Sequence, residues 1–465
     1  MSKACDSRLG LFLASSGGRF HPALYSKQDE FGTSIYTSEP LEPSTSVVSC
    51  PFSLCITPSL ARRALPTSLF CPPETVAASS TEPTLPNSAR KNRQAHHELL
   101  CLYLVLHLLP VEALAAVAKL DLQHEPYVSK LPSHDDMRTT LYFSPAERDL
   151  LRGSNLHGAT LDRERAWKEE FDEVKTWIPL QEVRDLLTWQ DWLWACTIIS
   201  SRAFPSHLLD GDKSGSTPVL FPGIDMLNHK PTAKLTWSSD VHVTTSATNK
   251  QGKDGKGMLS IVVDEPVPVD TQVFNTYGAK SNEELLLGYG FVLSDPNPAD
   301  CVALKLSLPP NCSLELFDLI HLLKLEGMRH FVGRNGRLPD ELQAQMRLLL
   351  SPPELIQDLL EAVKTAEGAH WTEFVEFLGW ETELDMLDTL EGMLESKLAA
   401  LKGIDAAQPL DGAREDVRQM IEVYRQGQIV ILESAIETRN KLMSDTMKRA
   451  EEEGIEMEYE DEDDS

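Results

Sequence analysis

The sequence predicts an α+β protein, because β-like and helical stretches occupy different parts of the chain. Residues 1–66 and 220–308 contain short β-like pieces bounded by turn residues, among them "FGTSIYTSEPL", "TSVVSCPFSLCIT", "KLTW", "LSIVVD" and "QVFNTYG". Residues 121–215, and those after about residue 309, have instead the texture of helices. A chain of 465 residues with 42% hydrophobic content can hold two or three domains with sizeable cores.

The first half of the chain contains one linker and two helical stretches. Residues 67–95 are rich in Pro, Ser and Thr, which predicts a disordered linker. An apolar helix is expected from about His96 to Ala118. Residues 121–215 form a helical insert in the β-rich part. Its core anchors are expected to be the five tryptophans Trp167, Trp177, Trp189, Trp192 and Trp194.

The second half returns from strands to helices. The loop "NKQGKDGKG" at 249–257 has no apolar residue and predicts an exposed hairpin tip. From residue 309 to about 448 the chain is expected to be helical. One stripe at three- and four-residue spacing consists of Val417, Ile421, Tyr424, Ile431, Leu432, Ala435 and Ile436. Residues 449–465 form an acidic tail, expected to be disordered.

The net charge of −28 disfavours direct binding to nucleic acid and favours basic protein partners. Ten of the carboxylates lie in "EEEGIEMEYEDEDDS", so solubility alone is an equally good explanation of the tail. The apolar run "LLCLYLVLHLLP" is too short to cross a membrane. The eight cysteines are scattered without a C-x-x-C pair or a zinc-type spacing. We therefore expect no metal, no membrane contact, and a cytoplasmic or nuclear location.

Two segments have unusual polar residues beside apolar ones. "LFPGIDMLNHKP" places Asn228 and His229 directly after a core-like run, where each polar side chain needs a partner. "VFNTYGAKSNEELLLGYGFV" contains Tyr277 and Tyr289, each followed by a glycine that allows close backbone approach. No phosphate-binding loop, H-E-x-x-H or G-x-S-x-G motif occurs. Read from spacing alone, these residues favour a structural role and name no ligand.

The two segments resemble the SET-domain methyltransferases, in the branch of the plant Rubisco large-subunit lysine methyltransferase and the fungal ribosomal-protein lysine methyltransferases. "FPGIDMLNH" is similar to the P-x-x-D-x-x-N-H pattern of that family, and "NTYGAKSNEELLLGYGFV" to its Y-G-x-x-[SN]-N-x-E-L-x-x-x-Y-G-F pattern. "SSGGRFHPALYSKQDEFGTSIYTSEPL", "LTWQDWLWACTIISSRAF" and "VYRQGQIVIL" resemble its opening strands, its helix ending in Ser-Arg and its closing helix. The resemblance covers nearly the whole chain.

The resemblance implies a SET β-fold with knot-like threading, divided by the helical insert and followed by an all-α substrate-binding domain. Residues 1–66 and 96–308 would form the SET domain, and residues 309–448 the substrate-binding domain. In this family the Asn-His segment is threaded beneath a neighbouring loop, which general topology rules disfavour.

The resemblance also assigns roles to individual residues. S-adenosylmethionine would be the cofactor. Tyr277 and Tyr289 would be catalytic, Tyr277 also touching the cofactor. The other implied cofactor-binding residues are Phe31, Gly32, Thr33, Arg202, Asn228 and His229. The implied substrate-binding residues are Asp225, Tyr289 and Phe291.

Two departures from the family pattern matter. Many relatives have G-x-G at the cofactor loop, whereas this chain has Gly32-Thr33-Ser34. The linker at 67–95 is also longer than such a domain needs. A closing cysteine cluster is absent after Phe291, as expected for this branch.

The function implied is methylation of a lysine in a basic protein, with a ribosomal protein favoured, by a monomer. Two alternatives stay open at this point. One is protein-histidine methylation, which the retained Tyr289 disfavours. The other is a catalytically silent SET-fold adaptor, which the intact Tyr277 and Asn228-His229 disfavour.

Overall fold

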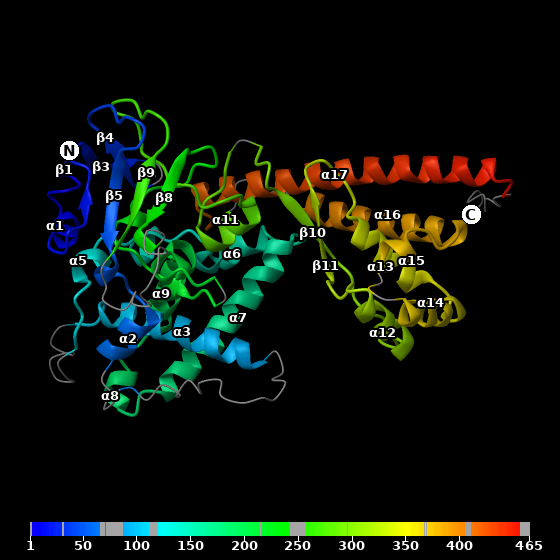
Figure 1. Ribbon diagram of the computed structural model, residues 1–465, viewed down its shortest axis with the longest axis horizontal. Coiled ribbons are helices and arrows are strands. Elements are labelled where there is room, and N and C mark those ends of the chain that lie inside the picture. The colour runs from blue at the N-terminus through cyan, green and yellow to red at the C-terminus, as the bar shows by residue number, and fades with distance from the viewer. Residues whose placement is uncertain are drawn as a thin grey trace, which may run out of the picture. The chain divides into compact units, whose positions relative to one another are not determined.

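The structure is a computed structural model of the chain (Figure 1). It describes residues 2–29, 32–65, 70, 87–110, 120–213, 215–241, 257–294, 296–366, 368, 370–404 and 411–455, with the backbone alone for 87–95. The predicted hairpin tip at 249–257 lies outside the described residues except for Gly257, as do most of the linker and the last ten residues of the tail.

The chain divides into two compact units. The first consists of residues 1–141, 161–279 and 288–290, and the second of residues 142–160, 280–287 and 291–465. This division does not follow the predicted boundary at 309. The reason is apolar packing, since Leu151 and Leu286 belong to one buried cluster with Val417 and Tyr424 of the C-terminal helix. Earlier parts of the chain therefore complete the core of the second unit.

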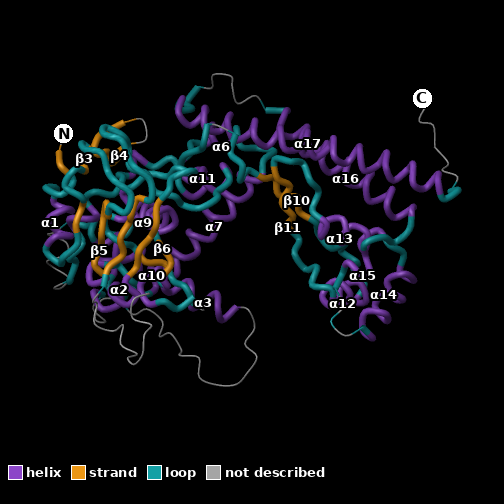
Figure 2. The backbone as a smooth tube through the Cα atoms, turned by 45° about the horizontal axis from the view of Figure 1, so that its top comes forward, coloured by secondary structure: helices purple, strands orange, loops and turns teal. Residues whose placement is uncertain are grey.

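The first unit contains antiparallel sheets. A four-stranded sheet has the order β2-β5-β9-β8, and a three-stranded sheet the order β1-β3-β4. The strands β5, β9 and β8 lie side by side in Figures 1 and 2. The strands of this unit are β1 Ser2–Lys3, β2 Arg19–Phe20, β3 Leu24–Asp29, β4 Gly32–Thr37, β5 Ser46–Pro51, β6 Phe204–Pro205, β7 Pro218–Val219, β8 Leu235–Ser239 and β9 Met258–Val263.

The first unit also contains helices, and two α-helices lie within residues 1–66, where only short strands and turns were predicted. The helices of the first unit are α1 Arg8–Ala14, η1 Phe52–Leu54, α2 Pro58–Ala64, α3 Asn87–Leu106, α5 Glu125–Val128, η2 His134–Asp136, α8 Gln181–Arg184, α9 Trp189–Arg202, α10 His207–Asp210 and η4 Ile224–Met226. Residues of both units occur in η3 Thr140–Tyr142, α7 Asn155–Thr176 and α11 Asn282–Gly288.

The helix α9 shows how local sequence sets an element that the site needs. Thr188 caps its start by accepting a hydrogen bond from the N–H of Asp191 at 3.1 Å. Trp192 and Trp194 are buried, whereas Trp189 is only partly buried because it lies at the first helical position. The helix α3 packs against α9. The end of α9 brings Arg202 toward the predicted site.

Three predicted elements differ from the structure. The helix expected from about His96 to Ala118 begins at Asn87, inside the predicted linker, and ends at Leu106. The expected strand "QVFNTYG" forms only isolated bridges at Gln272 and Asn275, because it contacts several different segments rather than one partner strand. The tail was expected to begin at 449, but α17 continues to Glu452.

The second unit is mainly helical and also contains a two-stranded antiparallel sheet, whose second strand lies in the region that was predicted to be helical. Its core lies between α13, α16, α17 and this sheet, and α16 and α17 lie side by side (Figure 2). The predicted stripe on α17 is buried except for Ile436, which is partly buried. The elements of this unit are α6 Pro145–Asp149, β10 Cys301–Lys305, α12 Leu314–Leu322, β11 Arg329–Gly333, α13 Asp340–Leu350, α14 Pro353–Thr365, α15 Thr372–Val375, α16 Trp380–Lys402 and α17 Glu415–Glu452.

None of the helices in the described part of the chain combines the length and apolar composition that a membrane crossing requires.

A buried carboxylate joins the segment 142–160 to the start of α17 inside the second unit. Glu147 accepts hydrogen bonds from the N–H of Ser144 at 2.8 Å and from the Arg414 guanidinium at 2.9 Å. The Glu147 side chain is fully buried and that of Arg414 is 36% exposed. Burial by itself raises the pKa of Glu147, but the bonds from Arg414 and Ser144 outweigh it and hold the pKa below its usual value.

We therefore predict that Glu147→Gln lowers the unfolding free energy by about 1–3 kcal/mol at neutral pH. A carboxylate with a lowered pKa in the folded state stabilises the fold above its unfolded-state pKa, and this contribution is lost as the pH falls through the folded-state pKa. The difference between variant and wild type should therefore shrink below about pH 4. Urea denaturation at several pH values measures it.

The matched control is Glu415→Gln, at the first residue of α17. Glu415 pairs with Arg418 on the surface, and its side chain is 65% exposed, so this change should leave stability unaltered. Equal effects of the two substitutions would contradict the role given to Glu147.

Candidate functional site

The Asn-His segment pairs in parallel with the segment that carries the first Tyr-Gly. The N–H of Asn275 donates to the carbonyl of Asn228 at 2.8 Å, and the N–H of Lys230 donates to the carbonyl of Asn275 at 2.9 Å. His229 lies opposite Asn275 in this short parallel bridge. Two parts of the chain that are far apart in sequence are thereby held in one register.

The side chain of Asn228 ties this pair of segments to strand β4. Its Nδ2 donates to Ser34 Oγ at 2.8 Å, and the Ser34 hydroxyl donates to Asp29 Oδ1 at 2.9 Å. Ser34 is fully buried. The serine that departs from the G-x-G pattern therefore points into the fold and is used as a hydrogen-bond partner.

Tyr277 is packed in a stack of rings. Its ring stacks on His229 with centroids 4.9 Å apart and an interplanar angle of 17°, and on Tyr289 at 5.2 Å and 22°. The N–H of Tyr277 donates to His229 Nδ1 at 3.1 Å, and its hydroxyl donates to the carbonyl of Leu227 at 3.0 Å. The structure therefore brings together three of the residues that the sequence singled out.

Burial sets the protonation states in this stack. It lowers the pKa of His229, which keeps the imidazole neutral so that Nδ1 accepts the Tyr277 N–H. Burial also raises the pKa of Tyr277, although the nearby Arg202 opposes this. The Tyr277 hydroxyl is therefore protonated at neutral pH, as its bond to the carbonyl of Leu227 requires, and its oxygen can still accept a hydrogen bond.

Arg202 is held beside this stack by a buried carboxylate. Its Nη1 donates to both the backbone carbonyl and Oδ2 of Asp225 at 3.0 Å, and the Tyr127 hydroxyl donates to the same Oδ2 at 2.9 Å. Burial raises the pKa of Asp225, while Arg202 and Tyr127 lower it. The Asp225 side chain is only 1% exposed, so its contacts orient Arg202 and leave little surface for a protein substrate.

The two Tyr-Gly glycines have different uses. Both have positive φ, +88° at Gly278 and +83° at Gly290, which side chains disfavour. A Cβ at Gly290 would lie 2.8 Å from the backbone of Arg138, so this glycine permits close backbone packing. A Cβ at Gly278 would meet nothing within 4 Å, so the backbone there borders open space.

The remaining predicted residues are placed less closely around Tyr277. Phe31 lies outside the described residues. Gly32 and Thr33 are exposed at the β3–β4 turn, next to the buried Ser34, and Thr33 Oγ1 accepts a bond from Gln28 Nε2. Phe291 is partly exposed and belongs to the second unit. The roles of these residues stay predictions.

Sequence reasoning missed four groups that position the site. These are the hydroxyls of Tyr127 and Ser34, the carbonyl of Leu227, and the side chain of Asn275, whose Oδ1 accepts from Trp237 Nε1 at 2.9 Å. Asn275 lies within the second motif, and its polar side chain between apolar residues was an available signal. Tyr127 gave none, because nothing in its local sequence links it to Asp225.

Comparison with known proteins agrees with this geometry, although no family model matches the chain. A ribosomal lysine N-methyltransferase of Schizosaccharomyces pombe is 28% identical over 90% of this chain and 68% of its own length. A ribosomal lysine N-methyltransferase of Saccharomyces cerevisiae is 25% identical over 70% of this chain and 60% of its own length. A chloroplastic fructose-bisphosphate aldolase-lysine N-methyltransferase of Arabidopsis thaliana is 33% identical over 37% of this chain.

Solved structures share the fold over nearly the full chain. The SET domain of LSMT bound to lysine and AdoHcy has a TM-score of 0.70 at 18% identity, and covers 97% of this chain and 96% of that chain. Rubisco LSMT bound to AdoMet has a TM-score of 0.69, with 99% of each chain covered. With the two motifs brought together around Tyr277, these findings show a chain with the fold of the LSMT SET-domain structures and a sequence similar to the fungal ribosomal lysine N-methyltransferases.

Proposed function

We propose that this protein methylates a lysine of a basic protein, with a ribosomal protein as the favoured substrate, and that Tyr277 is its central catalytic residue. The observation that carries the proposal is the position of Tyr277, stacked on both His229 and Tyr289 with its hydroxyl fixed on the carbonyl of Leu227. A hydroxyl held in one place can orient a methyl group and an amine and stabilise the cation that forms.

The residues around Tyr277 fit S-adenosylmethionine. Asn275 Nδ2 is a buried donor with no hydrogen-bond partner among the described residues, and the Gly278 backbone borders open space. Both features suit a polar ligand lying against bare backbone. Arg202, Asn228, His229 and the backbone near Thr33 would hold the cofactor. When bound, it supplies a sulfonium methyl group to a neutral amine.

The chain's own residues provide the conditions for that transfer. A buried channel lowers the pKa of a lysine amine and so helps it lose its proton. Arg202 carries the fixed positive charge of the site, and we assign to Asp225 and Tyr127 the role of holding it in place. Tyr289 would lie beside the target side chain. Phe291 and the helical region 309–448 would contact the substrate protein.

The substrate class is proposed from the net charge of the chain and from the named activities of its relatives. The net charge of −28 attracts a basic protein and repels nucleic acid. The named activity of two fungal relatives is ribosomal lysine methylation. We propose a monomer that works in the cytoplasm or nucleus.

The test is calorimetric titration with S-adenosylmethionine, followed by transfer of radiolabelled methyl groups to ribosomes and to cell extract. We expect one cofactor per chain and label on lysine of a ribosomal protein. Label on histidine would favour the histidine methyltransferase alternative. Binding of the cofactor without any transfer, or no binding at all, would favour the silent adaptor.

Tyr277→Phe should lower kcat by about 100-fold or more and leave cofactor affinity nearly unchanged, because a group that acts in the transition state contributes little to ground-state binding. Single-turnover methyl transfer and calorimetry measure the two quantities. The matched control is Tyr25→Phe, which removes another hydroxyl of the first unit, bonded to Asp270 at 3.3 Å. Wild-type turnover in Tyr277→Phe would remove this residue from the catalytic role.

Asn228→Ala should weaken cofactor binding and also lower the unfolding free energy by about 1–3 kcal/mol, because it leaves the buried Ser34 hydroxyl short of a partner. Ser34→Ala should reproduce the stability loss. The double variant should lose less than the two single losses together, since both remove the same bond. Unchanged melting and affinity in Asn228→Ala would contradict this placement.

Removing residues 456–465 should leave kcat and melting unchanged but lower kcat/KM at low salt. The carboxylates of this segment attract a basic substrate, and salt screens exposed charges over about 8 Å at physiological ionic strength. Steady-state kinetics across a salt series measures this, and truncated and full-length values should converge at high salt. Identical kcat/KM at every salt concentration would leave solubility as the role of the tail.

A longer truncation serves as the control. Removing 451–465 also deletes Glu453, which accepts a bond from Trp380 Nε1 at 3.0 Å, and the end of α17. This variant should melt at a lower temperature than the shorter truncation.

A further inference from the structure

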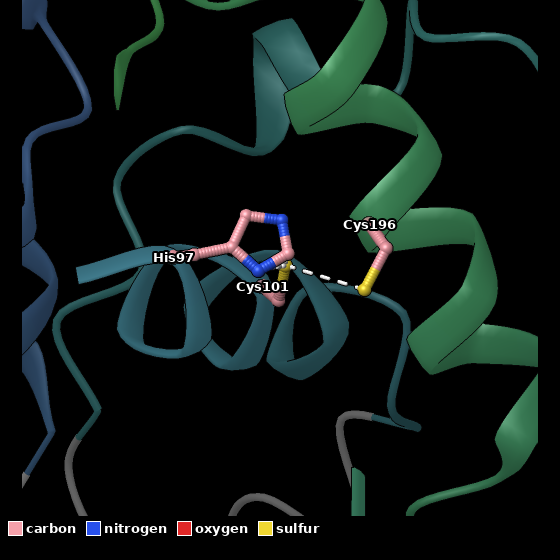
Figure 3. Close-up of side chains that lie close together, drawn as sticks. All are labelled: His97, Cys101 and Cys196. Carbon is pink, nitrogen blue, oxygen red and sulfur yellow. Dashed lines mark hydrogen bonds between the residues drawn. The ribbon is translucent and has the colours of Figure 1, made fainter. Parts of the chain in front are cut away.

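A second cluster of reactive side chains lies in the first unit, away from the residues around Tyr277. His97 and Cys101 are one helical turn apart on α3, and Cys196 lies on α9 (Figure 3). Their donor atoms all lie within 4.8 Å of one another. Both thiols are fully buried, while the His97 side chain is 20% exposed.

The spacing within the cluster matches a tetrahedral metal site. Two thiolates on one zinc ion, each at about 2.3 Å, lie about 3.8 Å apart, and an imidazole nitrogen lies about 3.6 Å from each sulfur. Here the Cys101 and Cys196 sulfurs are 3.7 Å apart, and His97 Nε2 is 3.7 Å from Cys101 Sγ. Buried cysteines often serve as apolar filling, but an imidazole nitrogen facing paired sulfurs is a donor set that such filling does not need.

A carboxylate lies close to one nitrogen of the imidazole. His97 Nδ1 is 3.3 Å from Glu170 Oε2 on α7, and the ring stacks on Trp167 at 6.5 Å and 23°. A carboxylate on one ring nitrogen leaves the other nitrogen to bind a metal, and this pairing is the usual outer shell of zinc-bound histidine.

The charges around the cluster also call for a cation. Glu98 is 1% exposed, and its Oε1 has no hydrogen-bond partner among the described residues. Glu170 on α7 is a second carboxylate beside the cluster, and its side chain is largely buried. A bound dication would offset this excess of acidic groups.

We propose that His97, Cys101 and Cys196 bind one zinc ion, with Glu170 orienting the imidazole. Sulfur and imidazole ligands select a borderline-soft ion of this kind over magnesium or calcium. The thiol protons pass to solvent when the ion binds. The fourth ligand would be water or a neighbouring carboxylate.

Such an ion would fasten α3 to α9. The same helix α9 carries Arg202 less than two turns beyond Cys196, so the metal would also brace the helix that presents Arg202 to Asp225. We therefore assign the ion a structural role and predict that it stabilises the first unit.

The test uses the reduced full-length protein. After equilibrium dialysis against Zn²⁺, elemental analysis should find one zinc per chain. Co²⁺ in its place should give the intense sulfur-to-metal absorption of thiolate ligands. Saturating Zn²⁺ should raise the melting temperature by roughly 5 °C, because the ion binds the folded state.

Four variants locate the ion. Cys101→Ser, Cys196→Ser and His97→Asn should each lose stoichiometric metal and the thermal shift, and Glu170→Gln should weaken affinity by about 10–100-fold. His97→Asn is decisive if the cysteine variants fold poorly, because its side chain is partly exposed. The matched control is Cys55→Ser, a buried thiol directed at the carbonyl of Pro51, which should bind zinc as the wild type does.

Two results would overturn the proposal. One is a reduced wild-type protein that retains no zinc and shows no thiolate absorption with Co²⁺, including the case in which mass analysis finds a Cys101–Cys196 disulfide in the oxidised protein. The other is undiminished metal binding in His97→Asn, which would place the ion elsewhere on this acidic chain.

Discussion

The parallel pairing of Asn228–Lys230 with Asn275 is the contact on which the rest of the site depends. Two backbone hydrogen bonds set the register, and that register places the Tyr277 N–H on the His229 imidazole. A shift of one residue would turn the side chains of one segment to the opposite side. The stack of His229, Tyr277 and Tyr289 would then no longer form. The geometry around Tyr277 is thus a consequence of backbone pairing between segments that are 48 residues apart.

Polar groups next to the apolar core are acceptable here because each one positions another. Asn228 binds the hydroxyl of Ser34, and Ser34 binds Asp29. Asp225 accepts hydrogen bonds from both Arg202 and Tyr127. Removing a partner from such a buried set leaves a polar group unsatisfied, which costs more than the bond alone contributes. The same burial keeps His229 neutral and Tyr277 protonated. The packing of these side chains in the fold therefore also determines their protonation states.

The helix α9 connects this site to the rest of the first unit. Its capped start, its buried tryptophans and Cys196 hold it against the insert and α3, and its last residue is Arg202. Because a helix is stiff over this length, packing at its middle decides where the guanidinium at its end lies. The second unit has a core of its own, in which Glu147 and Arg414 join the segment 142–160 to the last helix.

Much of this protein could be predicted from local patterns. Helix periodicity identified α9 and the buried stripe of α17, and turn residues located β4, β5, β8 and β9. The two motifs identified Tyr277, Tyr289, Asn228 and His229. Such features depend on neighbours in sequence, where side-chain spacing and capping act directly.

Contacts between distant residues could not be predicted in this way. The use of 142–160, 280–287 and 291–308 in the second unit, the hydrogen bond from Tyr127 to Asp225, and the burial of Ser34 all follow from tertiary packing. The meeting of Cys196 with His97 and Cys101 joins residues 95 positions apart, so no local spacing could indicate it. Sequence patterns report which residues share a helix or strand, whereas only the folded chain decides which helices and strands meet.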